Sequence, residues 1–377
     1  MFAGPRGRRL LLELASALSP EVARQCFYAA RLLHPSGTPS RLAFEAGSNA
    51  PPHVTPEQVA SAVAEVDLSQ ITADAAWTAL VAAVDAAAYW QPPGGEDALA
   101  AAPELAGVLG GLAQAVCDTR ALPEGDHKGS TMVIWPRDDD PTPWPVPAAA
   151  ATILQEWSAR ARQHEAIAAR TWPTDPAHGV SSDWWSTPPH GLVVSTPNDP
   201  ARGPWGLACV EDGFGEEVAR VAPVTVSPSA RVHAISTAED WVALCRLAPL
   251  EVTASKRSDW FHTTGRGDVR WVIPDWAAVA EEYDAVQLTL TGYLDLAGRA
   301  LEVYPGVGSV IAGWNPGETY HFGAVSIGAE PPVVWRLDDE SRHWKPAAVT
   351  SPPRGAPHRV EHTAAIGLIP APIHAPP

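Results

Sequence analysis

The hydrophobic residues of this chain change their spacing near His190, and this change limits the folds open to it. From residue 6 to about 118, apolar residues recur at the three- and four-residue intervals of helices, as between Val59 and Val63. After His190, short runs of alternating apolar and polar residues indicate strands. The pattern predicts an α+β protein: a helical N-terminal region followed by a mixed, mainly antiparallel β-sheet domain with short helices.

Proline-rich stretches divide the 377 residues into four predicted parts. Four prolines fall between Arg137 and Pro147, which is typical of a linker or an irregular loop. Past Trp344 the chain is rich in Pro, Ala and His, a composition that predicts disorder. The predicted parts are a helical region (1–118), a Pro/Trp-rich linker with one helix (119–190), an α+β domain (191–344) and a disordered Pro-rich tail (345–377).

Short motifs mark where several helices begin. Ser19 precedes Pro20, which places a capping hydroxyl before a proline in the first turn. Thr55 and Gln58 have the spacing of a capping box. Asp275 is placed to cap a helix that begins at Trp276, and the aromatic stripe of that helix is expected to pack in the core.

Two further predictions concern strands in the α+β domain. The run Ala285–Thr291 is predicted to be a half-buried strand whose polar face, open to solvent or a ligand, carries Gln287, Thr289 and Thr291. The sequence Asn315-Pro316-Gly317-Glu318 suits a type II turn. We expect this turn to join 309–314 to 318–322 as a hairpin.

The charge balance argues against nucleic acid as a partner. The chain has 43 acidic and 26 basic residues and a formal net charge of −17, which repels a phosphate backbone and an anionic membrane surface. No run of apolar residues approaches the length of a membrane span. The expected partner is therefore a small molecule or another protein, and the oligomeric state is left open.

The cysteines favour a reducing compartment. Cys26, Cys117, Cys209 and Cys245 are far apart and form no CxxC pair or Cys/His metal spacing, so we expect reduced thiols and no metal site. Arginines near the N-terminus precede an apolar run as in a secretory signal, but Glu13 interrupts that run. A cytoplasmic location is the prediction.

The residues from Asp259 to Phe322 combine Trp, Tyr, His, Arg and Asp with dense strand and helix signals. In a predicted loop from Trp260 to Asp268, His262 has the chemistry of a general base and Arg266 that of a carboxylate or phosphate clamp. The candidate catalytic residues are His262, Arg266, Tyr283 and Glu318. The candidate ligand-binding residues are Trp260, Gln287, Thr289, Trp314 and His321. Glu211, in a separate acidic turn, is expected to be exposed.

Two functions remain open. The order of strands and helices, with Arg, His, Trp, Tyr and a late Glu318, resembles that of ADP-ribosyltransferase-like domains, although no motif of that family is present. The resemblance implies a small-molecule enzyme that uses NAD. The absence of a catalytic signature favours instead a partner- or ligand-recognition protein with an aromatic-lined cleft in its C-terminal domain. The sequence alone does not specify a cofactor.

Overall fold

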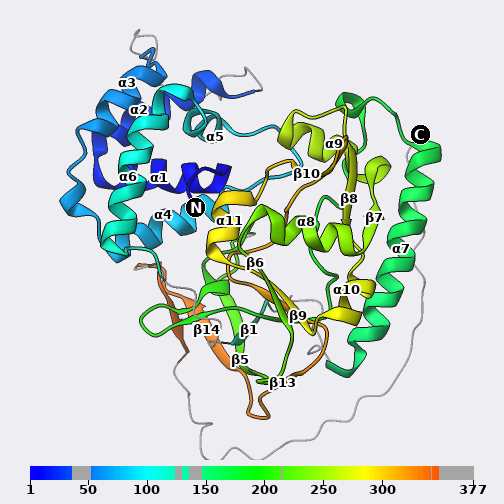
Figure 1. Cartoon of the computed structure of the whole chain (residues 1–377). Coiled ribbons are helices and arrows are strands. Elements are labelled where there is room, and N and C mark those ends of the chain that lie inside the picture. Colours follow the sequence, from blue (N-terminus) through cyan, green and yellow to red (C-terminus); the bar gives the residue numbers. More distant parts are fainter. Residues whose placement is uncertain (36–51, 124–129, 136–146, 214, 341, 348–377) are drawn as a thin grey trace, which may run out of the picture. The chain divides into compact units, whose positions relative to one another are not determined.

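Helices account for the first third of the described chain (Figure 1). The computed structural model describes residues 1–35, 52–123, 130–135, 147–213, 215–340 and 342–347. The N-terminal helices are α1 (Pro5–Leu18), α2 (Pro20–Leu33), α3 (Pro56–Ala64), α4 (Ala73–Asp85), α5 (Gly95–Ala100) and α6 (Ala106–Thr119). The predicted helical N-terminal region is confirmed.

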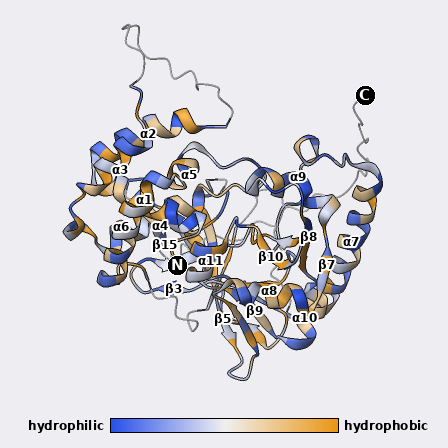
Figure 2. Ribbon diagram, turned by 45° about the horizontal axis from the view of Figure 1, so that its top comes forward, coloured by the Kyte–Doolittle hydropathy of each residue, from blue (hydrophilic) through white to orange (hydrophobic). Residues whose placement is uncertain are grey.

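Side-chain caps explain where these helices begin. The Ser19 hydroxyl accepts a hydrogen bond from the Val22 amide at 3.3 Å, and the Gln58 side chain accepts one from the Thr55 amide at 2.9 Å. Each bond satisfies a donor at a helix start. Both predicted starts are confirmed. Hydrophobic and hydrophilic residues alternate along α2 and α3 in Figure 2, as expected of helices with one buried face.

In the part of the chain that the structure describes, three larger sheets and five more α-helices follow. The first sheet has β1 (Thr131–Ile134), β5 (Val218–Val226), β14 (Val333–Leu337) and β15 (Trp344–Pro346) in order, with β13 (Val325–Ile327) also on β5. The second has β10 (Leu301–Tyr304), β11 (Val307–Ser309), β8 (Arg270–Pro274) and β7 (Pro249–Glu251). The third has β2 (Val193–Ser195), β12 (Thr319–His321), β9 (Ala285–Leu288) and β6 (Val232–Ile235).

The remaining elements connect these sheets. A short pair joins β3 (Asn198–Asp199) to β4 (Gly203–Pro204). The later helices are α7 (Ala150–Thr171), α8 (Ala238–Leu247), α9 (Thr253–Thr264), α10 (Trp276–Glu282) and α11 (Leu290–Leu296). Of the strand pairs in the described residues, only β6–β9 and β8–β11 are parallel. The predicted α+β class with mainly antiparallel sheets is confirmed.

Three local predictions are wrong. The strand predicted over Ala285–Thr291 ends at Leu288, because the Thr289 hydroxyl caps α11 by accepting a hydrogen bond from the Gly292 amide at 3.1 Å. The predicted loop that begins at Trp260 includes the last turns of α9. The predicted hairpin is absent since β11 and β12 belong to different sheets, although the turn itself forms, with Gly317 at φ +79°.

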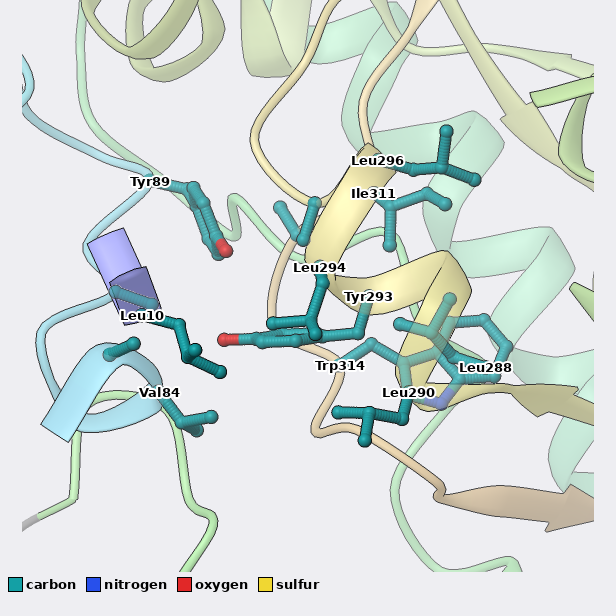
Figure 3. Packing of buried hydrophobic residues seen from close by; sticks show 14 of the residues in the cluster. Leu10, Val84, Tyr89, Leu288, Leu290, Tyr293, Leu294, Leu296, Ile311 and Trp314 are labelled. Carbon is teal, nitrogen blue, oxygen red and sulfur yellow. The ribbon is translucent and has the colours of Figure 1, made fainter. Parts of the chain in front are cut away.

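One hydrophobic core extends from the N-terminal helices to the third sheet. Its buried side chains include Leu10 on α1, Val84 on α4 and Leu294 on α11, which lie around Tyr293 in Figure 3. Helix α1 packs directly against α11, and Gly4 is so close that a Cβ there would lie 2.2 Å from the Asp295 carbonyl oxygen. The helical region therefore shares its interior with the second and third sheets, while buried residues of the first sheet form two smaller clusters.

The C-terminal end of the described chain is a strand. β15 extends the first sheet through Pro346 and pairs with β14. The rest of the predicted disordered tail, residues 348–377, lies outside the described residues. Among the helices that the structure describes, none combines the length and apolar character needed to cross a membrane.

Candidate functional site

A cavity of about 480 Å³ lies at the carboxyl ends of the parallel strands β6 and β9. The register pairs Ile235 with Leu288, so the two strands end side by side. Ser236 follows β6 and Thr289 follows β9, and both line the cavity. Side chains that follow neighbouring parallel strands meet at the same sheet edge, which is a common place for ligands.

Hydrogen bonds hold the polar wall of this cavity in place. The Thr289 hydroxyl lies 3.1 Å from the Ser236 hydroxyl and donates to the Ile235 carbonyl at the same distance. The Gln287 amide nitrogen lies 3.4 Å from the carbonyl oxygen of Gly317. Thr291 adds a further hydroxyl to the lining. Hydroxyls and an amide fixed by neighbouring strands give a preorganised hydrogen-bonding surface.

The opposite wall comes from the helical region and the start of the chain. Val116, Cys117 and Arg120 line it from the end of α6, and Phe2 comes from the first residues. Arg120 has a left-handed backbone (φ 49°), which ends α6, and Leu122 and Pro123 after it also line the cavity. This wall supplies apolar surface, one guanidinium and one thiol.

Cys117 is the accessible thiol of this protein. All four cysteines are free, and Cys26, Cys209 and Cys245 are buried while Cys117 is exposed. Burial raises the pKa of the Cys26 thiol to about 11 and that of Cys245 to about 12, which makes both poor nucleophiles at neutral pH. A thiol reagent therefore has one favoured target, and that target lines the cavity.

Two of the predicted ligand-binding residues, Gln287 and Thr289, meet at this cavity. The other three lie in the interior. Trp260 and Trp314 are 0% exposed, and their indole nitrogens donate to the carbonyls of Trp184 at 3.0 Å and Glu318 at 3.2 Å. These tryptophans pack in the core and do not line this cavity. Phe2 is the one aromatic residue of its described lining.

His321 forms a buried pair with Ser195 on neighbouring strands. The Ser195 hydroxyl lies 2.8 Å from His321 Nε2, and His321 Nδ1 has no hydrogen-bond partner among the described residues. Burial lowers the pKa of His321 to about 4, so the imidazole is neutral at physiological pH. A serine–histidine pair is suited to nucleophilic catalysis when a third group orients the histidine and substrate has access. Neither condition is met by the described residues.

The four candidate catalytic residues do not form one site. Arg266 is half-exposed and pairs with Asp268 at 3.2 Å, and Tyr283 packs its ring against His233. His262 lies on α9, with its ring against Phe261. Glu318 lies in the interior network described next. None of the cavities described here brings two of them together.

A buried polar network passes through Glu211, which the sequence predicted to be exposed. Glu211 is 9% exposed, and the Tyr89 hydroxyl donates to its carboxylate at 2.9 Å. The Glu211 amide donates to the Asn315 side-chain oxygen at 2.8 Å, and the Asn315 side-chain nitrogen donates to Glu318 at 2.8 Å. Asn315 thereby links the backbone of Glu211 to the carboxylate of Glu318.

Burial keeps the carboxyl groups of Glu211 and Glu318 protonated to a higher pH than is usual for glutamate. It raises the pKa of Glu211 to about 7 and that of Glu318 to about 7. The Tyr293 hydroxyl falls short of hydrogen-bond geometry with Glu211, yet burial and the nearby carboxyl both raise the pKa of this phenol. Figure 3 shows Tyr89 and Tyr293 with their hydroxyls turned toward the same region.

A second cavity, of about 280 Å³, contains a buried lysine. The Lys256 ammonium donates to the Asp183 carbonyl and lies 5.8 Å from the centre of the Trp260 ring. Burial lowers the pKa of Lys256, while Asp183 and Asp259 oppose that change. Because the Asp183 carbonyl and the Trp260 ring contact the ammonium, Lys256 has the contacts of a packed interior residue.

Comparisons with known proteins add no functional information. The chain matches no family model, no curated protein and no solved structure. The described residues also contain no group of three or more His, Cys, Asp or Glu side chains arranged to hold a metal ion.

Proposed function

We propose that this protein recognises a small polar molecule in the 480 Å³ cavity at the ends of β6 and β9. The observation that carries this proposal is the convergence of Ser236, Gln287, Thr289 and Thr291 on one cavity. Fixed polar groups beside apolar surface are the usual composition of a small-molecule site, and this volume is in the usual range. Recognition of a protein partner is the competing form of the hypothesis.

The lining indicates the class of ligand. On the strand side, the Ser236 and Thr291 hydroxyls offer donors and acceptors, while the Thr289 hydroxyl already donates to the Ile235 carbonyl. Arg120 on the helical side is the charged side chain of the described lining, and it suits a carboxylate or another single negative charge. Phe2 and Val116 provide an apolar surface for the rest of the molecule. A neutral or singly anionic metabolite with several hydroxyl or amide groups fits these features.

The NAD-using enzyme receives no support from geometry. His262, Arg266, Tyr283 and Glu318 do not meet in the described cavities, so no base, nucleophile and substrate clamp are assembled from them. NAD nevertheless belongs in the ligand panel. NAD consumption by the protein would favour the enzyme over the recognition function proposed here.

A cytoplasmic location also stays a proposal. Four free cysteines, three of them buried, are consistent with a reducing compartment.

Thermal shift against a metabolite panel, combined with labelling of Cys117, tests the proposed site. A ligand that binds the folded protein raises the melting temperature according to its affinity. Because Cys117 lines the cavity, the same ligand is expected to slow the reaction of this thiol with a disulfide reagent. A Cys117→Ser variant establishes that the labelling signal comes from Cys117.

A matched pair of substitutions on β6 separates the cavity from the surface around it. Ala234 is exposed and lines the cavity, whereas Val232, two residues earlier, is exposed and lies outside the described lining. Ala234→Phe is expected to abolish ligand binding, and Val232→Phe to preserve it. A ligand that binds both variants equally, or that leaves Cys117 labelling unchanged, contradicts the proposed site.

A further inference from the structure

A separate cavity of about 510 Å³ lies beside the start of α1 and gathers three arginines. Arg6 and Arg8 reach it from α1, and Arg299 reaches it from the turn after α11. Asp97, on α5, is the carboxylate residue of the described lining. The lining therefore carries more positive than negative charge, in a protein whose net charge is −17.

Two of these arginines already have carboxylate partners. Arg6 is 4% exposed, lies 2.7 Å from the Asp97 carboxylate and donates to the Ala83 carbonyl at 3.0 Å. Arg299 pairs with Asp295 at 3.4 Å. Asp97 is shared, because Arg9 also lies 3.4 Å from it. The negative charge nearest to the cavity is thus divided between two guanidinium groups.

Arg8 lacks such a partner. It forms no ion pair within the described residues, it donates to the Ala3 carbonyl, and its Nε is buried without a hydrogen-bond partner. Burial lowers the pKa of Arg8, and the positive charges of Arg299 and Arg6 lower it further. Asp295 and Asp97 oppose this change without reversing it. A partly buried cation close to two other cations is destabilised, and an anion placed among them relieves that repulsion.

The rest of the cavity is largely apolar. Leu33, Ala88, Pro93 and Ala98 contribute to its walls. Thr263 and Thr264 line it from the end of α9, and the Thr263 hydroxyl donates to the Tyr89 carbonyl at 2.6 Å. A cavity lined by both apolar side chains and guanidinium groups is complementary to a molecule with an acidic head and an apolar body.

We propose that this cavity is a second ligand site, which binds a small amphiphilic anion with its carboxylate or phosphate group against Arg8 and Arg299. The apolar body of the anion contacts the wall formed by Leu33, Ala88 and Pro93. The site differs from the one at β6 and β9, whose described lining shares no residue with it.

Thermal shift and calorimetry test this site with four probes: octyl phosphate, octanoate, 1-octanol and inorganic phosphate. Octyl phosphate and octanoate are expected to raise the melting temperature, and the stronger of the two identifies the preferred head group. The neutral 1-octanol is expected to have at least about tenfold weaker affinity. Inorganic phosphate, which lacks the apolar body, is expected to bind more weakly than octyl phosphate.

Three variants locate the binding. Arg8→Gln and Arg299→Gln each remove one positive charge from the cavity, and each is expected to weaken anion binding by about tenfold or more. Arg24→Gln is the matched control, because Arg24 lies on the exposed face of α2 and pairs with Glu21. Ala101→Phe, at an exposed lining position, obstructs the cavity without changing charge and is expected to abolish binding.

Several results overturn the proposal. Equal affinity for octanol and octanoate removes the role of charge, and equal affinity for inorganic and octyl phosphate removes the role of the apolar wall. Loss of binding in Arg24→Gln to the same extent as in Arg8→Gln assigns the effect to overall charge. Absence of binding by either anion at millimolar concentration, in a wild-type protein that unfolds cooperatively, rejects the site.

Discussion

Glu211 is a carboxyl group in the protein core, close to Tyr89, Tyr293 and the guanidinium of Arg6. Burial raises its pKa from the ordinary value of 4.5 to about 7. In that interval the folded protein keeps Glu211 protonated while the unfolded chain ionises it. The contribution of protonated Glu211 to the free energy of unfolding is therefore fully present below about pH 4.5 and is lost as the pH rises to about 7.

The first prediction follows from this loss of stability with rising pH. Glu211→Gln keeps an acceptor for the Tyr89 hydroxyl but cannot ionise, so its stability relative to wild type is expected to increase between pH 4.5 and 7, by on the order of 3 kcal/mol. Urea unfolding at several pH values measures the difference. Glu104→Gln, at an exposed position, is the control. A constant difference between Glu211→Gln and wild type across this range contradicts the prediction.

The sequence identified two residues of the candidate site and missed Glu211 for a physical reason. Gln287 and Thr289 were visible because they alternate with apolar residues next to a strand, and a local pattern is sufficient to show that. Glu211 directly precedes the turn signal that begins at Asp212, and it contacts Tyr89 and Asn315, which are distant in sequence. The pattern around Glu211 holds no signal for those contacts.

Among the elements, α9 shows how a distant residue can determine a helix. Its sequence is rich in Ser, Thr and Asp, which are poor helix formers, and has no side-chain cap of its own. Glu165 on α7 supplies the cap by accepting hydrogen bonds from the Ala254 amide at 2.7 Å and the Ser255 amide at 2.8 Å. Local sequence signals predicted α10 correctly and missed this helix, since its cap lies on another element.

The second prediction compares glycines in two helices. In α5, a Cβ on Gly95 would lie 1.9 Å from the Ala30 carbonyl oxygen of α2. In α6, a Cβ on Gly110 would meet nothing within 4 Å. Gly95→Ala is therefore expected to lower the free energy of unfolding by about 1–3 kcal/mol because the two helices must separate. Gly110→Ala is expected to raise it by about 1 kcal/mol.

Chemical denaturation of the two variants measures these changes. A lower free energy of unfolding in Gly95→Ala, with a higher one in Gly110→Ala, shows that close packing of α5 on α2 requires Gly95. If both variants are stabilised, α5 does not pack on α2 as described.

For the whole molecule, the main question left open by the sequence is whether the N-terminal helices form an independent unit. The change in hydrophobic spacing near His190 predicted the two kinds of secondary structure and their order. It contained no information on contacts between them, because a buried helix face looks the same whichever element covers it. In the structure, α1 packs against α11, and both contribute to one core.

The third prediction uses this shared core. Leu10 on α1 is 0% exposed and lies near Tyr293 of α11 (Figure 3). Leu10→Ala is expected to cost about 2–5 kcal/mol. The helical region up to residue 118 contains two tryptophans, Trp77 and Trp90, while most of the buried tryptophans lie in and after α8, so fluorescence mainly follows the sheet-bearing part.

Because the core is continuous, Leu10→Ala is expected to lower the unfolding midpoints by fluorescence and by far-ultraviolet circular dichroism to the same extent. Leu32→Ala, at an exposed position on α2, is the control and is expected to leave both midpoints nearly unchanged. Two separated transitions, with only the dichroism signal shifted in Leu10→Ala, reveal a helical region that unfolds independently. A single shifted transition means that any ligand bound between the α6 end and the β6–β9 edge stabilises the helices and the sheets together.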